Sequence, residues 1–214
     1  MKLLKRRKGL SFKIITIIFA NVVIINSLIL AYIYKVSHDT ISANLKENSK
    51  LLTHSTVNEV EKILTAVQKM PVNISRVIEN GNYTSADLVD ILKIGVGSNE
   101  EIFGAAIAFE PEYRGKEKEY SVLYAFKNKG KVELSYLAKN DYSFTTLDWY
   151  LIPKELRKPL WSEPYFDEGL GNIIMSTYSV PLYKKVNGEK KLIGILTADI
   201  SLDWLQNIVS SIKV

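Results

Sequence analysis

The chain has 214 residues, no cysteine and a formal net charge of +5. That length allows one sizeable core with an accessory segment, and the lack of cysteine excludes disulfides, thiolate metal sites and a cysteine nucleophile. Much of the positive charge precedes the first apolar segment, at Lys2, Lys5, Arg6, Arg7, Lys8 and Lys13. Because the rest of the chain is close to neutral, we expect no basic surface for nucleic acid.

No metal site and no cofactor are expected. His38 and His54 are the two histidines, and their spacing does not bring them to one helix face as an i, i+4 pair would. Two solvated helix residues are the simpler interpretation. The sequence also lacks a Walker loop, a Gly-x-Ser-x-Gly elbow and a His-Glu-x-x-His motif.

A membrane-spanning helix is predicted over residues 14–34. The stretch is uncharged, lies between Lys13 and Lys35, and is long enough for the hydrocarbon core of a bilayer. The basic residues before it predict a cytoplasmic tail, residues 1–13, and an extracytoplasmic location for everything after Lys35. A cleaved signal peptide is the alternative, which the length of the run and the lack of a small-x-small site disfavour. We therefore expect a single-pass protein of the inner or plasma membrane.

Residues 35–80 are predicted to form a stalk helix. Apolar residues recur at steps of three and four, at Val60, Ile63, Val67, Met70, Ile74 and Val77. This stripe fits either the seam of a parallel homodimer or packing against the domain's own sheet, the more common use. Pro71 is expected to kink or restart the helix, and Asn80-Gly81-Asn82 to end it.

Residues 81–214 are predicted to form one α+β module with an antiparallel sheet of about five strands. A short helix is expected from about Ser85, its N-cap, to Ile94, with Gly95 as its stop. Hairpin turns are expected at 127–130 and 186–189, a helical or irregular excursion at 148–160, and a last helix after Ser201. The five strand-like runs are IFGAAIAF, EYSVLYAF, KVELSYLA, IIMSTYSVPLY and KLIGILTADI. A small-molecule pocket is expected between the sheet and the excursion.

Four segments of this module resemble the Cache family of PAS-like extracytoplasmic sensor domains in bacterial signal-transduction receptors, in particular the membrane-distal module of double Cache domains. They are Asp148-Trp149-Tyr150, WSEPYFD at 161–167, TYSVP at 177–181, and Gly194 with ADIS at 198–201. The resemblance covers nearly everything after the membrane segment. It implies a sensor of a small metabolite for transmembrane signalling rather than an enzyme.

The resemblance also implies a set of binding residues. In amine- and amino-acid-binding members, a Trp-Tyr pair, a later Tyr-x-Asp and a final Asp line the pocket, which here are Trp149, Tyr150, Tyr165, Asp167 and Asp199. Aromatic faces attract a cation and carboxylates accept hydrogen bonds from ammonium, so this set suits an amine. Further candidates are Tyr142, Tyr178 and Asp148.

Position 147 departs from the family pattern. Amino-acid binders of the family carry an arginine two positions before the tryptophan, and this sequence has Leu147 there. Leucine cannot clamp a ligand carboxylate, so an amine or another small polar metabolite is favoured over a standard amino acid.

Structural roles are the alternatives for several of these residues. Trp161, Pro164 and Phe166 suit packing and turns. Asp199 could cap the helix that follows it, while Tyr142 and Tyr178 could be ordinary strand aromatics.

Two other functions remain open from the sequence. One is a structural ectodomain that kept the fold and lost the pocket. The other is a secreted glycoside hydrolase that uses two acids among Glu163, Asp167 and Glu168.

Double Cache receptors continue into a membrane-proximal module, a second membrane helix and an output domain, whereas this chain ends at Val214. A receptor fragment, a truncated reading frame and a stand-alone anchor are all compatible with this. The mechanistic hypothesis is that ligand closes residues 148–167 over the sheet and shifts the stalk helix of a homodimer.

Overall fold

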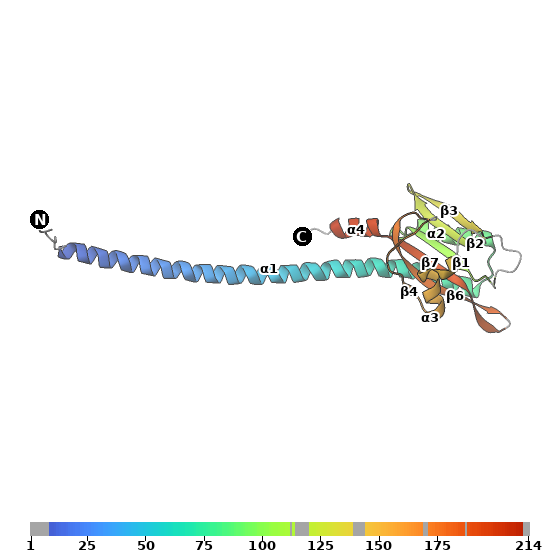
Figure 1. Cartoon of the computed structure of the whole chain (residues 1–214), viewed down its shortest axis with the longest axis horizontal. Helices are drawn as coiled ribbons and strands as arrows, with labels where there is room; N and C mark the ends of the chain where they lie inside the picture. Colours follow the sequence, from blue (N-terminus) through green and yellow to red (C-terminus); the bar gives the residue numbers. More distant parts are fainter. Residues whose placement is uncertain are drawn as a thin grey trace. The chain divides into compact units, whose positions relative to one another are not determined.

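The computed structural model describes residues 9–111, 113, 120–138, 144–168, 171–186 and 188–211. The chain divides into two compact units, residues 1–55 and 56–214. Helix α1, Leu10–Asn80, begins in the first unit and ends in the second (Figure 1). The functional site lies in the second unit.

The described part of the first unit is helical. Residues 14–34 of α1 are all exposed. Among the described residues, α1 is the one helix that is long and apolar enough, by length and composition, to cross a membrane. An apolar helix surface of this length is stable in lipid, where the backbone satisfies its own hydrogen bonds.

The apolar stripe of α1 packs against the domain's own sheet. Ile63, Val67 and Met70 are buried in the main core. Near the end of the helix the buried residue is Ile78, which lies four residues after Ile74 and so on the same face. Val77, which was expected on this face, is half exposed. The helix is continuous through Pro71 and ends at Asn80, so the expected stop is confirmed and the restart is not found.

Helix α2, Ser85–Gly97, begins where it is predicted to begin, but its N-cap and its end differ from the prediction. Its N-cap is Thr84, whose hydroxyl accepts a hydrogen bond from the Asp87 N–H at 3.2 Å while the Asp87 carboxylate accepts one from the Thr84 N–H at 2.8 Å. This reciprocal capping box places the N-cap one residue before Ser85. The helix continues past Gly95, where an added Cβ would lie 3.3 Å from the Met70 sulfur. Gly95 therefore allows α2 to pack closely against α1 and does not end the helix.

The described residues form one antiparallel sheet of seven strands in the order β3-β2-β1-β7-β6-β4, with β5 paired to β6. All five predicted strands are present, and the two-residue strands β4 and β5 lie in the segment between α3 and β6. Their bounds are β1 Gly104–Phe109, β2 Tyr120–Asn128, β3 Lys131–Ala138, β4 Leu160–Trp161, β5 Tyr165–Phe166, β6 Ile174–Val186 and β7 Glu189–Ser201. The β2–β3 turn has positive φ at Lys129 and Gly130, 48° and 79°, as a type I′ hairpin requires.

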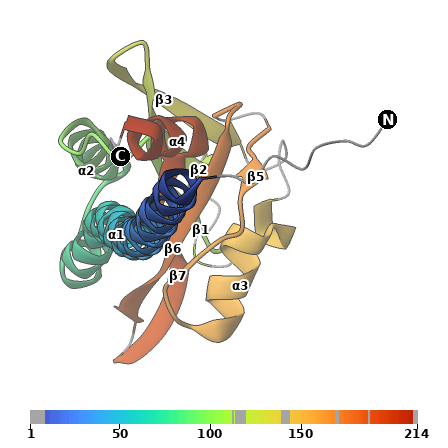
Figure 2. The same cartoon turned by 90° about the vertical axis from the view of Figure 1, so that its left-hand side faces the viewer.

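The two faces of the sheet carry different helices. The C-terminal part of α1 and α2 cover one face, and the short helix α3, Asp148–Leu156, covers the other (Figure 2). A 3₁₀ turn, Phe144–Thr146, precedes α3, and α4, Leu202–Ser211, follows β7. Because side chains alternate along β7, Leu196, Ala198 and Ile200 pack toward α1 and α2. Thr197 and Asp199 point to the α3 side, where the site lies.

Candidate ligand-binding site

A small inner pocket lies between the α3 face of the sheet, helix α3 and strand β5. Its volume is about 20 Å³, enough for one water molecule. The sheet contributes most of its walls, while Trp149 comes from α3 and Tyr165 from β5. The lining residues are Ala106, Val122, Tyr124, Trp149, Tyr165, Asp167, Met175, Thr177, Thr197 and Asp199.

Two buried carboxyl groups dominate the chemistry of the inner pocket. Asp167 and Asp199 are each only 4% exposed. Burial raises the pKa of Asp199 to about 7, the negative charge of Asp167 adds to the rise, and a hydrogen bond from Thr177 partly opposes it. Burial also raises the pKa of Asp167, partly offset by a hydrogen bond from the Gly171 N–H to its carboxylate. No lysine or arginine stands among the described lining residues, so this negative charge has no cationic partner there.

Aromatic side chains enclose these acids. The Tyr165 and Thr177 hydroxyls are 2.8 Å apart, and Thr177 donates a hydrogen bond of 2.8 Å to Asp199. The pKa of Tyr124 is raised well above its ordinary value by burial and then by the nearby charge of Asp199, so this phenol stays protonated. The Trp149 indole N–H is buried without a hydrogen-bond partner in the described structure. It is therefore free to donate to a bound molecule or to water.

An outer pocket of about 480 Å³ adjoins the inner one. Trp149 and Tyr165 line both pockets. The segment that carries Tyr165 is fixed to β6 by Ser162, whose N–H donates to the Thr177 carbonyl at 2.8 Å and whose hydroxyl accepts from the Thr177 N–H at 3.0 Å. The outer lining is acidic and apolar: Thr146, Leu147, Asp148, Trp149, Ser162, Glu163, Pro164, Tyr165, Phe166 and Glu168.

The structure brings together four of the eight residues proposed from the sequence: Trp149, Tyr165, Asp167 and Asp199. Asp148 lines the outer pocket. The alternative of Asp199 as a helix cap is wrong, because Asp199 lies within β7 and Ser201 accepts the capping hydrogen bond from the Trp204 N–H at 3.3 Å.

Two other expected residues lie elsewhere, and a third is not among the described residues. Tyr178 packs against Trp161, with ring centroids 5.2 Å apart. It follows Thr177 in β6 and so points to the opposite face of the sheet. Tyr150 donates its hydroxyl hydrogen bond to Glu110, away from the inner pocket. Tyr142 lies outside the described residues.

The sequence did not predict the sheet residues that line the inner pocket. Val122 and Tyr124 on β2, Thr177 on β6 and Thr197 on β7 all line the inner pocket. The alternation in YSVLYAF places Val122 and Tyr124 on one face, but the pattern alone does not say which face meets α3. Thr177 lies within the TYSVP segment, without a role assigned from the sequence.

Comparison with known families and structures relates this chain to receptor domains. Residues 88–207 match the family described as "Methyl-accepting chemotaxis protein-like, first PDC sensor domain". The chain belongs to this family. The expected resemblance to extracytoplasmic sensor domains is thereby confirmed, as is the function class of a ligand-binding sensor domain for signal transduction.

Individual relatives agree with the family. The methyl-accepting chemotaxis protein TlpQ of Pseudomonas aeruginosa is 26% identical over 144 residues, which cover 56% of this chain and 20% of TlpQ. The ligand-binding domain of the Campylobacter jejuni chemoreceptor Tlp3, in complex with L-valine, is 25% identical with a TM-score of 0.59 and covers 79% of this chain and 64% of that domain. This sensor domain thus spans a small part of TlpQ and under two thirds of the Tlp3 domain.

A more distant structure shows the same fold. The ligand-binding domain of the Pseudomonas aeruginosa amino-acid chemoreceptor PctC, in complex with GABA, is 15% identical with a TM-score of 0.55. The match covers 74% of this chain and 64% of that domain. The predicted PAS-like α+β class is therefore confirmed.

Proposed function

We propose that this chain is a membrane-anchored receptor module whose sensor domain binds a small cationic amine and passes the signal across the membrane. The observation that carries the ligand class is the pair of buried carboxyl groups, Asp167 and Asp199, in one pocket without a lysine or arginine among its described lining residues. Burying two such groups is costly unless they are neutralised or paired. An ammonium group supplies the missing positive charge and up to three donors.

The outer pocket suits the approach of the same ligand class. Asp148, Glu163 and Glu168 line it, and a cleft lined by one sign of charge concentrates ligands of the opposite sign. Leu147 also lines it, in place of the arginine that the family resemblance assigns to carboxylate binding. L-valine in Tlp3 and GABA in PctC both carry an amino group. For this chain we propose a ligand that has an amino group but needs no carboxylate.

Ligand entry requires the inner pocket to widen. At about 20 Å³ the space holds no molecule larger than water, so the ligand reaches the outer pocket first, and the inner pocket then widens by movement of Trp149 and Tyr165, which line both. This step gives the two arrangements of α3 and β5 that a signalling domain needs, because a ligand biases only states for which its affinities differ.

The proposed setting is the cell membrane. Residues 14–34 serve as a single-pass anchor, with residues 1–13 in the cytoplasm and residues 35–214 outside it. Two chains associate through the exposed part of α1. Reporter fusions after residue 13 and after residue 214, active in the cytoplasm and outside it respectively, test this orientation.

The proposal assigns binding and no catalysis. The hydrolase alternative needs two acids across one substrate cleft. Asp167 lines the inner pocket, so a catalytic pair that includes it would be divided between two pockets, while Glu163 and Glu168 share the outer one. The alternative of a ligand-free structural ectodomain predicts no binding at all.

Calorimetric titration of the full chain in detergent against matched amines, amino acids and carboxylic acids tests the proposal. We expect saturable binding of at least one primary amine and at least tenfold weaker binding to Asp167→Asn. Glu133→Gln, on β3, is a surface control that removes an acid outside both pockets. Binding of carboxylic acids alone, or no binding by the folded chain, would contradict the proposal.

A further inference from the structure

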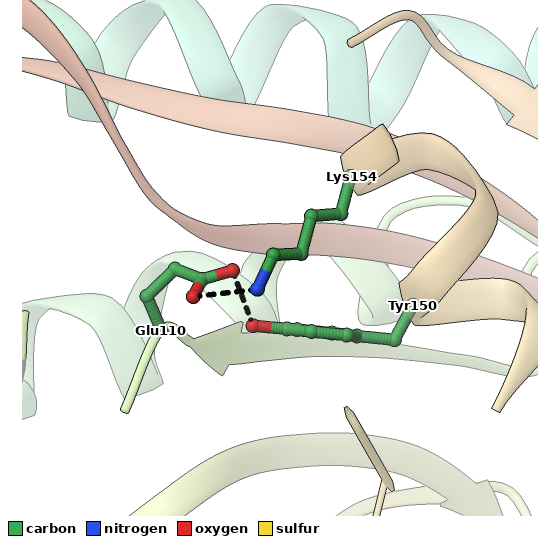
Figure 3. Close-up of polar contacts among 3 residues, drawn as sticks. All are labelled: Glu110, Tyr150 and Lys154. Atoms are coloured by element: carbon green, nitrogen blue, oxygen red, sulfur yellow. Dashed lines mark hydrogen bonds and ion pairs between the residues drawn. The ribbon is translucent and has the colours of Figure 1, made fainter. Parts of the chain in front are cut away.

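A second polar cluster ties α3 to the end of β1. The Tyr150 hydroxyl donates a hydrogen bond of 2.7 Å to Glu110, and the Lys154 ammonium donates one of 3.0 Å to the other carboxylate oxygen (Figure 3). The side chain of Glu110 is 12% exposed and that of Lys154 34%. Burial and the hydrogen bond to Glu110 raise the pKa of Tyr150 far above its ordinary value. Tyr150 therefore remains a donor throughout the physiological pH range.

Glu110 is a fixed anchor for this cluster. It directly follows β1, and its N–H donates to the Ile193 carbonyl of β7 at 2.9 Å. Tyr150 and Lys154 are four residues apart in α3, so they share one face of the helix and reach the same carboxylate. Together they connect the helix to the two central strands, β1 and β7, which also line the inner pocket.

Helix α3 has little local stability of its own. It has nine residues, its N-cap residue Leu147 makes no side-chain capping hydrogen bond, and Pro153 lies inside it. Short helices are marginal without tertiary contacts, and an internal proline removes a helix hydrogen bond. The position of α3 therefore depends on what it touches.

We propose that Glu110, Tyr150 and Lys154 form a latch that positions Trp149, so that the latch controls access to the inner pocket. Trp149 and Tyr150 are consecutive, and their rings are nearly perpendicular with centroids 5.9 Å apart. A shift of one ring is therefore transmitted to the other. The three latch residues act as positioning residues and do not touch the ligand. The role of the latch in ligand entry rests on the proposed function.

Aromatic packing is the competing means of holding α3. Phe144 contacts both Trp149 and Tyr150, with ring centroids 6.2 Å and 4.9 Å away. Tyr150→Phe distinguishes aromatic packing from the latch, because it keeps the ring and removes only the hydroxyl that donates to Glu110. Lys154→Met is the second variant, since it removes the charge and keeps most of the apolar stem.

The first test needs no ligand. In a Trp161→Phe, Trp204→Phe background of the full chain in detergent, Trp149 is the one remaining tryptophan, and acrylamide quenching reports its accessibility. Loss of a hydrogen bond to a charged group shifts an open–closed equilibrium by about tenfold. We expect Tyr150→Phe and Lys154→Met to raise the quenching constant severalfold. The matched control is Thr84→Ala, which removes the α2 cap on the opposite face and lowers stability without touching α3.

The second test uses the tightest-binding amine from the calorimetric titration, measured by stopped-flow quenching of Trp149. We expect both latch variants to raise the association and dissociation rate constants together, about tenfold, while Thr84→Ala changes neither. Unchanged quenching and unchanged rate constants in both variants would overturn the latch. If the parent chain binds no amine, the proposed function fails, and the quenching result still decides whether the latch positions Trp149.

Discussion

The Thr177 hydroxyl donates a hydrogen bond of 2.8 Å to Asp199 and lies 2.8 Å from the Tyr165 hydroxyl. A threonine hydroxyl has a single proton to give. When Asp199 is ionised, that proton points to the carboxylate, and Tyr165 must donate to Thr177. This chain of hydroxyls fixes Tyr165 on β5 relative to Asp199 on β7.

Thr177→Val should weaken amine binding about tenfold, because it removes the link between Tyr165 and Asp199 while keeping the shape of the side chain. Thr177→Ser keeps the hydroxyl and is the matched control, with affinity close to that of the parent. Calorimetric titration of both variants checks this. Equal amine affinity in the valine variant and the parent would show that the link is not used.

The stability of the ligand-free domain should fall as pH rises from about 4 to about 7. The pKa of Asp199 is about 7 in the folded chain and about 3.9 when unfolded. Since the folded state holds the proton more tightly, the stabilisation is complete below the unfolded pKa and is lost as pH rises through the folded one. Asp199→Asn should lack this loss and be more stable than the parent at pH 8, by on the order of a few kcal/mol.

Thermal unfolding of the parent and Asp199→Asn from pH 4 to pH 8 checks this prediction. Asp167, whose pKa is also raised, is present in both proteins, so the difference between the curves reports Asp199 together with its interaction with Asp167. A difference that stays constant with pH would contradict the raised pKa.

Amine affinity should depend on pH in the opposite direction. An ammonium ligand binds the ionised form of Asp199, whose pKa is about 7 in the free domain. Affinity should therefore be nearly constant above pH 7 and fall by up to tenfold per unit below it. Titrations at pH 6 and pH 8 with an amine that stays protonated at both values check this, and equal affinities would count against Asp199 as the ammonium partner.

Gly194→Ala should destabilise the domain by on the order of 3 kcal/mol or more. A Cβ at this position in β7 would collide with the Ala108 carbonyl oxygen and lie 2.9 Å from the Phe109 Cα. Both are backbone atoms of the paired strand β1 and cannot move without breaking the ladder. Gly97→Ala is the control, because its Cβ would meet only the Val132 side chain, at an ordinary 3.5 Å. Equal thermal unfolding of the two variants would contradict this account.

The sequence predicted the sheet well because the strands carry strong local signals. Alternating apolar residues and the turns at Lys129-Gly130 and Gly188 define both long hairpins. The end of α2 could not be predicted from the sequence, which favours a stop at Gly95. In the structure Gly95 packs closely against Met70 of α1 and the helix continues. A contact between two helices gives no local signal in the sequence. The short strands β4 and β5 form by pairing with β6. With two residues each, they are too short to show a strand pattern in the sequence.

The site was predicted in part. The family segments identified Trp149, Tyr165, Asp167 and Asp199, which the structure brings to one pocket. A motif does not give the direction of each side chain. Tyr150 is one residue from Trp149 yet bonds Glu110, a residue that no sequence pattern connects to it.

The most direct test of the account compares a primary amine with the alcohol of the same carbon skeleton in calorimetric titrations of the full chain and of Asp199→Asn. The two ligands have the same shape and differ in charge. We predict that the amine binds the parent at least tenfold more tightly than the alcohol, and that this preference disappears in Asp199→Asn. Equal binding of amine and alcohol by the parent, or an unchanged preference in the variant, would contradict the claim that the buried carboxyl groups select a cation.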